Sequence, residues 1–288
     1  MRPHLLYREP RDRAALYAVL ESSFPGLGRK IDAARALGFD WDAMTTPFVD
    51  RRDDRVVAHV GVLEVPLRLD GRSVRVGGIH AVCTLPELRR QGCYRRAMER
   101  ALRFVDERWE RAQLYTSQPA LYEPFGFRVV PTTSWEAARP PGPAAAVAAP
   151  VDLEDDLATL VEVLGRRAPL SQVYASVDEG WLFGIDAVLH TGDLSAVRRL
   201  PARDLFVAGK LVGERYTLFD VVGHHLPAWS ELAPHLPGSG PVTLAFTPDR
   251  FPQARARPLQ TASEGAYMVR GPFELEGRAF AVPPYAQH

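Results

Sequence analysis

One stretch of the sequence limits the fold more than any other. Residues 84–98, TLPELRRQGCYRRAM, place a lone glycine between an extended run and an amphipathic pattern. Before it, residues 56–69 and 73–85 have the composition of strands and are joined by Asp70-Gly71, a strong tight-turn signal. After Gly92, apolar residues recur at helical spacing while arginines take the opposite face. The stretch therefore predicts a β-hairpin that runs through a glycine turn directly into a helix.

The rest of the first half predicts helices before this motif and further strands after it. Apolar residues recur at helical spacing over residues 12–24 and about 30–37. Residues 112–117 are strand-like, and residues 119–125 predict a short helix with Pro at its first position and a glycine at its exit. Another strand is expected over 127–137. This order of elements predicts a mixed α/β (α+β) fold.

A Pro- and Ala-rich stretch, residues 138–150, has the composition of a linker and precedes a second mixed α/β half. In that half, helices are predicted over 152–168 and 227–236. Strand-like runs are predicted at residues 186–191, 204–223, 241–246 and 277–282. We therefore expect a first domain at 1–137, a linker at 138–150 and a second domain at 151–288, without a convincing internal sequence repeat.

Charge and hydropathy exclude several classes of partner. Lys and Arg together number 35, as do Asp and Glu, so no net charge steers the chain toward nucleic acid or an acidic membrane surface. No window of about 18 apolar residues predicts a membrane span, and the N-terminus lacks the apolar core of a signal peptide. We expect a cytoplasmic protein whose partners are small molecules.

Neither the cysteines nor the histidines predict a metal site. Cys83 and Cys93 flank the glycine turn without the spacing of metal ligands, and two cysteines do not make a disulfide framework, so both are expected to be free thiols. His224 and His225 are adjacent and have no third ligand at a helical or hairpin spacing. No metal is expected.

The glycine turn has the properties of an anion site. A helix that begins directly after a turn directs unpaired N–H groups and the positive end of its dipole outward. Gly92 allows close approach of a ligand, and Arg89 and Arg90 add positive charge. Neither a Walker loop nor a dinucleotide fingerprint is present. The alternative is that Gly92 only starts the helix and that the arginines, including the row Arg95, Arg96, Arg100 and Arg103, are solvated.

Two motifs together resemble the GNAT superfamily of acyl-CoA-dependent N-acetyltransferases. The first, VCTLPELRRQGCYRRAM, carries Arg89-Arg90-Gln91-Gly92-Cys93-Tyr94 where that family has Arg/Gln-x-x-Gly-x-Gly/Ala, and the second is LYTSQPALYEPFGF. Tyr94 departs from the small residue usual there. The bulky residue and the second α/β half are similar to the mycobacterial enhanced-intracellular-survival type of acetyltransferase. The resemblance implies a degenerate GNAT-like second domain, and we expect the C-terminal sterol-carrier-like domain of that type to be absent.

The resemblance implies that acetyl-CoA is the co-substrate. Its pantetheine would bond to the backbone of the strand before the turn, and its pyrophosphate would lie on the amides of the turn. The implied cofactor-binding residues are Val82, Cys83, Thr84, Arg89, Arg90, Gln91, Gly92, Cys93, Tyr94, Arg95 and Ser117.

The same resemblance implies direct attack of an amine on the thioester, with backbone N–H groups near Val82 stabilising the oxyanion. Tyr122 matches the general acid, because a phenol with a pKa of about 10 stays protonated at neutral pH; the alternative is a core aromatic. His80 is a candidate base, Glu64 is another, and water is a third. The chain-terminal carboxylate implied as base by the survival type cannot be transferred to His288.

We therefore expect an acetyl-CoA-dependent N-acetyltransferase that acts on a primary amine in a ternary complex. The alternative is a non-catalytic acyl-CoA-binding or regulatory protein of the same fold; a nucleotide-binding module without acyl chemistry is disfavoured by the missing motifs. An aminoglycoside, a polyamine, a peptide N-terminus and a protein lysine all stay open as acceptors, as does a homo-oligomer.

Overall fold

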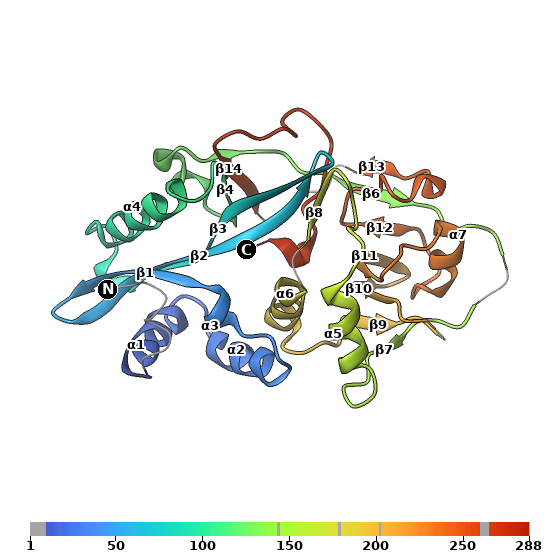
Figure 1. The fold of residues 1–288 in the computed structure, drawn as a ribbon, viewed down its shortest axis with the longest axis horizontal. Helices are drawn as coiled ribbons and strands as arrows, with labels where there is room; N and C mark the ends of the chain where they lie inside the picture. Colours follow the sequence, from blue (N-terminus) through green and yellow to red (C-terminus); the bar gives the residue numbers. More distant parts are fainter. Residues whose placement is uncertain (1–9, 143–144, 178–179, 202, 260–264, 288) are drawn as a thin grey trace.

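Two mixed β-sheets lie side by side in the computed structural model, with helices on their faces (Figure 1). The structure describes residues 10–142, 145–177, 180–201, 203–259 and 265–287. The predicted mixed α/β class is confirmed. Among these residues, no helix is both long and apolar enough to cross a membrane.

The first sheet has the strand order β1-β2-β3-β4-β14-β5, and β8 pairs with the far end of β2. Its strands are β1 (Thr46–Arg52), β2 (Arg55–Leu69), β3 (Arg72–Thr84), β4 (Ala112–Thr116), β5 (Arg128–Val129), β8 (Tyr174–Ser176) and β14 (Ala266–Arg270). The predicted hairpin is confirmed: β2 and β3 pair antiparallel around Asp70 and Gly71, which both have positive φ, as a type I′ turn requires.

Beside the hairpin, β3 and β4 run parallel but pair only briefly. The pairing is confined to Gly77 with Ala112 and Gly78 with Gln113, although β3 continues to Thr84. The two strands therefore separate toward the C-terminal end of β3. Backbone groups on that edge of β3 are not used by β4 over the described residues.

The helices of the first half lie on opposite faces of this sheet (Figure 1). They are α1 (Pro10–Glu21), α2 (Leu27–Ala36), α3 (Trp41–Met44) and α4 (Cys93–Asp106). The apolar stripe of α4, which includes Ala97, Met98 and Ala101, packs on Val60 and Ile79. On the other face, α1 and α2 contribute residues to a different buried cluster, which also contains Cys83.

The second sheet has the strand order β13-β6-β12-β11-β10-β9-β7. Its strands are β6 (Ser134–Ala137), β7 (Ala149–Pro150), β9 (Val197–Arg199), β10 (Phe206–Val212), β11 (Arg215–Val222), β12 (Val242–Leu244) and β13 (Arg257–Leu259). The accompanying helices are α5 (Leu157–Gly165), α6 (Trp181–Thr191) and α7 (Trp229–Leu232). Here too a hairpin, β10–β11, is followed by a parallel neighbour, β12.

The two halves exchange strands. β14, which comes near the end of the chain, pairs antiparallel with β4 in the first sheet. β6, which precedes residue 138, pairs antiparallel with β12 in the second sheet. The division at residues 138–150 stays a prediction about domains, and each sheet contains strands from both sides of it.

Two strands predicted in the second half are wrong. Residues 186–191 belong to α6, which begins after Gly180 and ends before Gly192, both with positive φ. Residues 182–188 of this helix are all buried, so this continuous run could not be distinguished from a buried strand by periodicity. Residues 277–282 are not a strand: Phe280, Ala281 and Val282 are buried, but they lie in a segment without regular secondary structure. The strand β14 was not predicted.

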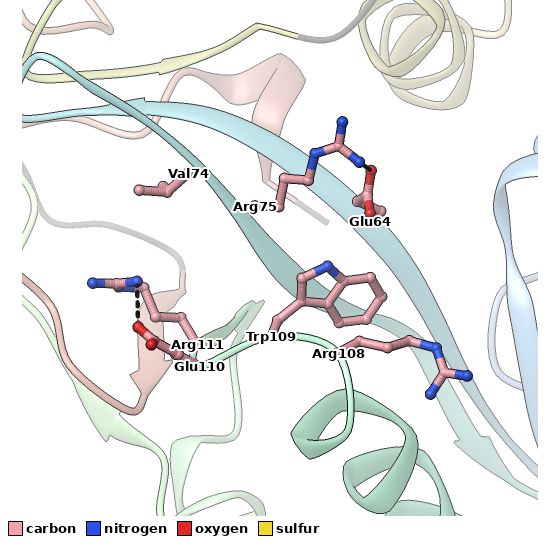
Figure 2. A pocket seen from close by; sticks show the side chains of 7 residues that line it. All are labelled: Glu64, Val74, Arg75, Arg108, Trp109, Glu110 and Arg111. Carbon is pink, nitrogen blue, oxygen red and sulfur yellow. Dashed lines mark hydrogen bonds and ion pairs between the residues drawn. The ribbon is translucent and has the colours of Figure 1, made fainter.

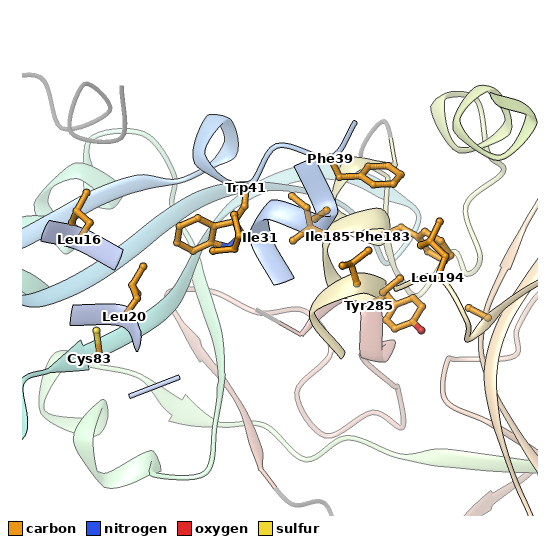
Figure 3. Packing of buried hydrophobic residues seen from close by; sticks show 14 of the residues in the cluster. Leu16, Leu20, Ile31, Phe39, Trp41, Cys83, Phe183, Ile185, Leu194 and Tyr285 are labelled. Atoms are coloured by element: carbon orange, nitrogen blue, oxygen red, sulfur yellow. The ribbon is translucent and has the colours of Figure 1, made fainter. Parts of the chain in front are cut away.

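A shared core joins the halves (Figure 3). Leu16, Ile31 and Trp41 from the first half lie in one buried cluster with Phe183 of α6 and Tyr285 near the C-terminus. The Nζ atom of Lys30 on α2 also donates a hydrogen bond of 2.5 Å to the Leu189 carbonyl of α6. The first sheet and its helices are therefore held against the second half by apolar packing.

Candidate functional site

A β-bulge near the end of β3 decides where its side chains point. The β2–β3 register shifts between His59 and Gly61, and Ala81 has a φ of 50°. An alanine in this left-handed region is strained, and the His59 Nδ1 atom holds the Ala81 carbonyl at 2.8 Å. Because of the extra residue, Ile79 and Val82 both pack in the cluster under α4.

The turn after β3 contains two left-handed residues. Arg90 has a φ of 60° and Gly92 a φ of 78°, and α4 begins at Cys93 without a side-chain cap. The predicted helix start is confirmed. The first main-chain bond of the helix runs from Arg96 to Gly92, so helical geometry leaves the N–H groups of the first turn directed outward. An uncapped start of this kind is a suitable place for an anion.

The arginines near the turn fall into two groups. Arg89, Arg90 and Arg95 are exposed at the turn, and Arg89 lies 3.4 Å from the Thr84 carbonyl. Arg96 and Arg100 instead turn to the carboxylate of Asp50 on β1, at 2.7 and 3.2 Å. The row of arginines is therefore neither wholly solvated nor wholly directed at the turn.

Tyr122 follows β4 on a segment of two short 3₁₀ turns, Pro119–Leu121 and Glu123–Phe125, which ends at Gly126. Its side chain is buried, with ring contacts to Tyr94 and Phe127. Burial raises the pKa of the Tyr122 phenol and a hydrogen bond with Thr116 opposes this, so the net pKa lies above the ordinary value. The phenol is protonated at neutral pH.

Tyr94, the departure from the small residue, joins the turn to the Tyr122 segment. Its hydroxyl donates a hydrogen bond of 3.0 Å to the Leu121 carbonyl. Its ring lies 6.1 Å from that of Tyr122 and 5.5 Å from that of Phe125, both edge-on. The sequence places Tyr94 on the apolar face of α4, but its contact with a segment 27 residues away depends on the tertiary fold.

The two base candidates lie in different places. His80 is buried, packs edge-on against Trp41 and lies 3.3 Å from the Thr45 hydroxyl. Trp41 belongs to the cluster under α1 and α2, whereas Tyr122 belongs to the cluster under α4. Glu64 pairs with Arg75 and lies opposite Gly77 in the β2–β3 register, well before Val82.

The remaining predicted residues lie at the C-terminal end of β3, at the start of α4 and just after β4. Val82 and Thr84 are partly buried at the end of β3, and Ser117 is exposed just after β4. Cys83 and Cys93 are buried free thiols, as predicted. Burial raises the pKa of Cys83 to about 12, despite opposing contributions from His59 and Arg89, which makes this thiol a poor nucleophile.

A hollow of about 480 Å³ lies elsewhere (Figure 2). It is near the start of β3, where Trp109 lies between the ion pairs Glu64–Arg75 and Glu110–Arg111. None of the residues predicted for the cofactor lines it. We therefore place the candidate site at the β3–α4 turn on chemistry rather than on the size of a hollow.

Within the described part of the chain, no three His, Cys, Asp or Glu side chains gather closely enough to hold a metal. His224 lies 3.5 Å from Glu162 of α5. The contacts of Asp50 with Arg96 and Arg100 were not predicted from the sequence, because an aspartate in the polar run FVDRRDDR gives no local sign of the two arginines it meets.

Comparison with known proteins agrees with this location. Residues 40–130 match the family model of the acetyltransferase (GNAT) domain. No curated protein sequence matches the chain.

Several solved structures resemble most of the chain. A GCN5-related N-acetyltransferase from Kribbella flavida is 17% identical, with a TM-score of 0.58 over 91% of this chain and 69% of that one. A probable N-acyltransferase from Enterococcus faecalis is 12% identical, with a TM-score of 0.59 over 91% and 70%. Eis1 from Mycobacterium abscessus is 17% identical, with a TM-score of 0.51 over 77% and 63%.

These similarities establish the fold. The chain has a GNAT-like two-domain fold of mixed sheets and helices, as the sequence predicted. The segment that matches the model of the GNAT acetyltransferase domain, residues 40–130, includes β3, the turn, α4 and Tyr122. Acyl transfer in general is the chemistry that this match supports.

Proposed function

We propose that this chain is a cytoplasmic, acetyl-CoA-dependent N-acetyltransferase that acetylates a primary amine. One observation carries the proposal: the separated end of β3 leads through a left-handed turn to the uncapped start of α4, inside the segment that matches the GNAT domain. That arrangement offers a free strand edge for an amide-containing chain and outward N–H groups for a pyrophosphate.

The residues present fit acetyl-CoA. Val82, Cys83 and Thr84 lie on the stretch of β3 that β4 does not pair with, and would bond the pantetheine through their backbone. The first-turn amides of α4 and the turn would hold the pyrophosphate. The exposed side chains of Arg89, Arg90 and Arg95 would add positive charge, with Gln91, Gly92, Cys93, Tyr94 and Ser117 completing the predicted set. The co-substrate supplies an activated acetyl thioester.

In the proposed reaction, the neutral amine attacks the thioester carbonyl, a C–N bond forms and the C–S bond breaks. Backbone N–H groups near Val82 stabilise the oxyanion that develops on the carbonyl oxygen. Tyr122 gives its phenolic proton to the leaving thiolate, a role that suits a phenol kept protonated by burial. The ammonium form of the acceptor loses its proton to a base beforehand. After the C–N bond forms, the nitrogen loses a second proton, which returns through solvent to the Tyr122 phenolate and restores the acid.

His80 is our proposal for that base, directly or through a water. It lies two residues before Val82, but its contacts with Trp41 and Thr45 are on the face of the sheet opposite the Tyr122 cluster. That separation favours the second candidate function, a non-catalytic acyl-CoA-binding protein. Tyr94, which already bonds the Leu121 carbonyl across the turn, favours it as well.

The acceptor is proposed only as a class. Aminoglycosides, polyamines, peptide N-termini and protein lysines all present a primary amine. The likeness to Eis1 concerns the fold of the two halves, and we propose that the second half helps to select the acceptor. A homo-oligomer is compatible with the proposal.

The test combines binding and turnover. Acetyl-CoA is titrated calorimetrically into the wild-type protein, and thiol release is then followed against a panel of amines. Tyr122→Phe is expected to bind acetyl-CoA normally and to lose about a hundredfold in kcat. Tyr216→Phe is the matched control, because burial also raises the pKa of that phenol, to about 12, but it lies in the second sheet.

The outcomes separate the candidates. The enzyme is supported if kcat falls in Tyr122→Phe, which makes Tyr122 the acid. His80 is supported as the base if the fall of kcat toward acidic pH disappears in His80→Gln. Acetyl-CoA binding without thiol release on any amine favours the non-catalytic reading. An absence of binding contradicts the proposal.

A further inference from the structure

The carboxylate of Asp50 lies under the start of α4 and takes hydrogen bonds from two arginines. Its side chain is only 7% exposed. Arg96 donates to it through Nε at 3.1 Å and through Nη2 at 2.7 Å, in the forked geometry that suits a carboxylate. Arg100 adds a bond of 3.2 Å. Burial raises the pKa of Asp50, but the bonds from Arg96 outweigh it, and the net pKa lies below its usual value.

The same guanidinium of Arg96 also reaches the turn. Its Nη1 atom donates to the Gln91 carbonyl at 3.3 Å, and Arg52 donates to that carbonyl at 3.4 Å. Arg52 donates in addition to the Gln91 side-chain oxygen at 3.1 Å. The Gln91 carbonyl in the middle of the turn therefore accepts hydrogen bonds from Arg96 of α4 and Arg52 of β1.

Holding this carbonyl fixes the direction of an amide. The peptide unit is planar and trans, so the Gln91 carbonyl and the Gly92 N–H point in opposite directions. The residues on both sides of Gln91, Arg90 and Gly92, have left-handed backbone conformations. This conformation is strained for Arg90 because, unlike glycine, it carries a Cβ. Such a conformation persists only where its surroundings impose it. The contacts from Arg96 and Arg52 are those surroundings.

We infer that Asp50 is a positioning residue for the pyrophosphate site: it anchors Arg96, which holds the Gln91 carbonyl and so aims the Gly92 N–H and the first amides of α4 at the ligand. This inference rests on the proposed function. It also means that Arg96 supports the site from behind, whereas Arg89, Arg90 and Arg95 face the ligand.

The test compares two thioesters, one with the pyrophosphate and one without it. Asp50→Asn keeps the shape of the side chain but weakens its hold on Arg96. We expect the Kd for acetyl-CoA, measured by calorimetry, to rise about tenfold, because a small misplacement of binding groups is costly. The second-order rate constant with S-acetylpantetheine, which has no pyrophosphate, is expected to stay unchanged.

Two further variants make the result specific. Asp106→Asn removes a carboxylate that pairs with Arg270 at the opposite end of α4, and it is expected to change neither quantity. Arg96→Lys keeps the charge but loses the fork that joins Asp50 to Gln91, and it is expected to reproduce the selective loss. Arg96→Lys also serves if Asp50→Asn does not fold.

Hydrogen exchange of the unliganded protein gives a readout that does not need the proposed function. The amides of Gln91 to Tyr94 are expected to exchange faster in Asp50→Asn, with β3 unchanged. Equal losses with both thioesters would make Asp50 merely structural and would overturn the inference, as would no loss with either one. A wild-type protein that binds no acetyl-CoA would overturn the proposed function itself.

Discussion

The two sheets share a layout but differ at one connection. In each, an antiparallel hairpin is followed by a parallel strand, β2–β3 with β4 and β10–β11 with β12. Each parallel strand then has an antiparallel neighbour from the other half of the chain, β14 and β6. From β3 to β4 the chain forms the left-handed turn and α4, whereas from β11 to β12 it forms only the four-residue α7 and a 3₁₀ turn.

That difference locates the proposed chemistry. A long helix that begins directly after a strand provides outward amides and a dipole. Between β11 and β12, a stretch that the structure describes throughout, the second sheet has no such helix. That the second half is a degenerate GNAT-like domain, as the resemblance implied, stays a proposal, and this difference favours it.

The hairpins also differ in what lies at their bulges. Each register shift has a glycine at which a Cβ would collide with a neighbour: Gly61 with the His80 imidazole in the first sheet, and Gly209 with the Thr217 carbonyl and the Tyr216 ring in the second. The first bulge carries the buried imidazole of His59. The second lies opposite Asp220, whose carboxylate forms a buried ion pair with Arg167 at 2.7 Å. We infer that the second bulge stabilises the fold through its buried ion pair, whereas the first bulge shapes the end of β3 at the candidate site.

The largest expected effect comes from breaking the ion pair of the second sheet. Both partners are at most 7% exposed, so Asp220→Ala leaves Arg167 as a buried, unpaired charge. Denaturant unfolding is expected to show a loss of about 3–5 kcal/mol. Glu64→Gln, which breaks an exposed pair in the first sheet, is expected to cost less than 1 kcal/mol. Weaker acetyl-CoA binding by the folded Asp220→Ala protein would contradict a purely stabilising role.

A pH dependence is expected from the bulge of the first sheet. Burial lowers the pKa of His59 to about 4, although its bond with the Ala81 carbonyl opposes the shift. Between the ordinary pKa of about 6.5 and about 4, the unfolded chain binds a proton that the folded protein does not. Stability is therefore full above this window and falls with pH through it, by about 3 kcal/mol.

His59→Gln should flatten that part of the pH profile. The quantity to compare is the free energy of unfolding at pH 7 minus that at pH 4, in the wild type and in the variant. If this difference is the same in the wild type and in His59→Gln, burial does not keep the His59 side chain neutral in the folded protein.

The smallest expected effect separates strain from binding. Gly92 and Gly213 both have positive φ, so Gly92→Ala and Gly213→Ala are each expected to cost about 1–2 kcal/mol of stability. Only the former should raise the Kd for acetyl-CoA, since its new Cβ would lie 3.0 Å from the Arg96 guanidinium, whereas a Cβ at Gly213 meets nothing within 4 Å. Equal Kd values for acetyl-CoA in the two variants would show that the turn does not contribute to binding acetyl-CoA.

Local patterns predicted much of the first half. The Asp70-Gly71 turn, the helix from Cys93 and the short helical segment around Tyr122 each depend on residues close in sequence. Long-range features were not accessible in the same way. The insertion of β14 beside β4 and the meeting of Asp50 with Arg96 join segments that no periodicity connects. The apolar run of α6 fitted a strand equally well until its packing was known.

The site followed the same division. The strand edge, the turn and Tyr122 were predicted from two motifs. The separation of His80 from Tyr122 depends on the bulge at Ala81, which reverses the alternation of β3 over one residue and has no sequence signal of its own.

Hydrogen–deuterium exchange of the wild-type protein with and without acetyl-CoA tests the central claim most directly, because it reports on both sheets in one experiment. We predict that acetyl-CoA slows amide exchange at residues 82–95 and around Tyr122 and leaves it unchanged over residues 204–223 in the second hairpin. Protection confined to the second sheet, or none at residues 82–95 when the ligand is saturating, would contradict it.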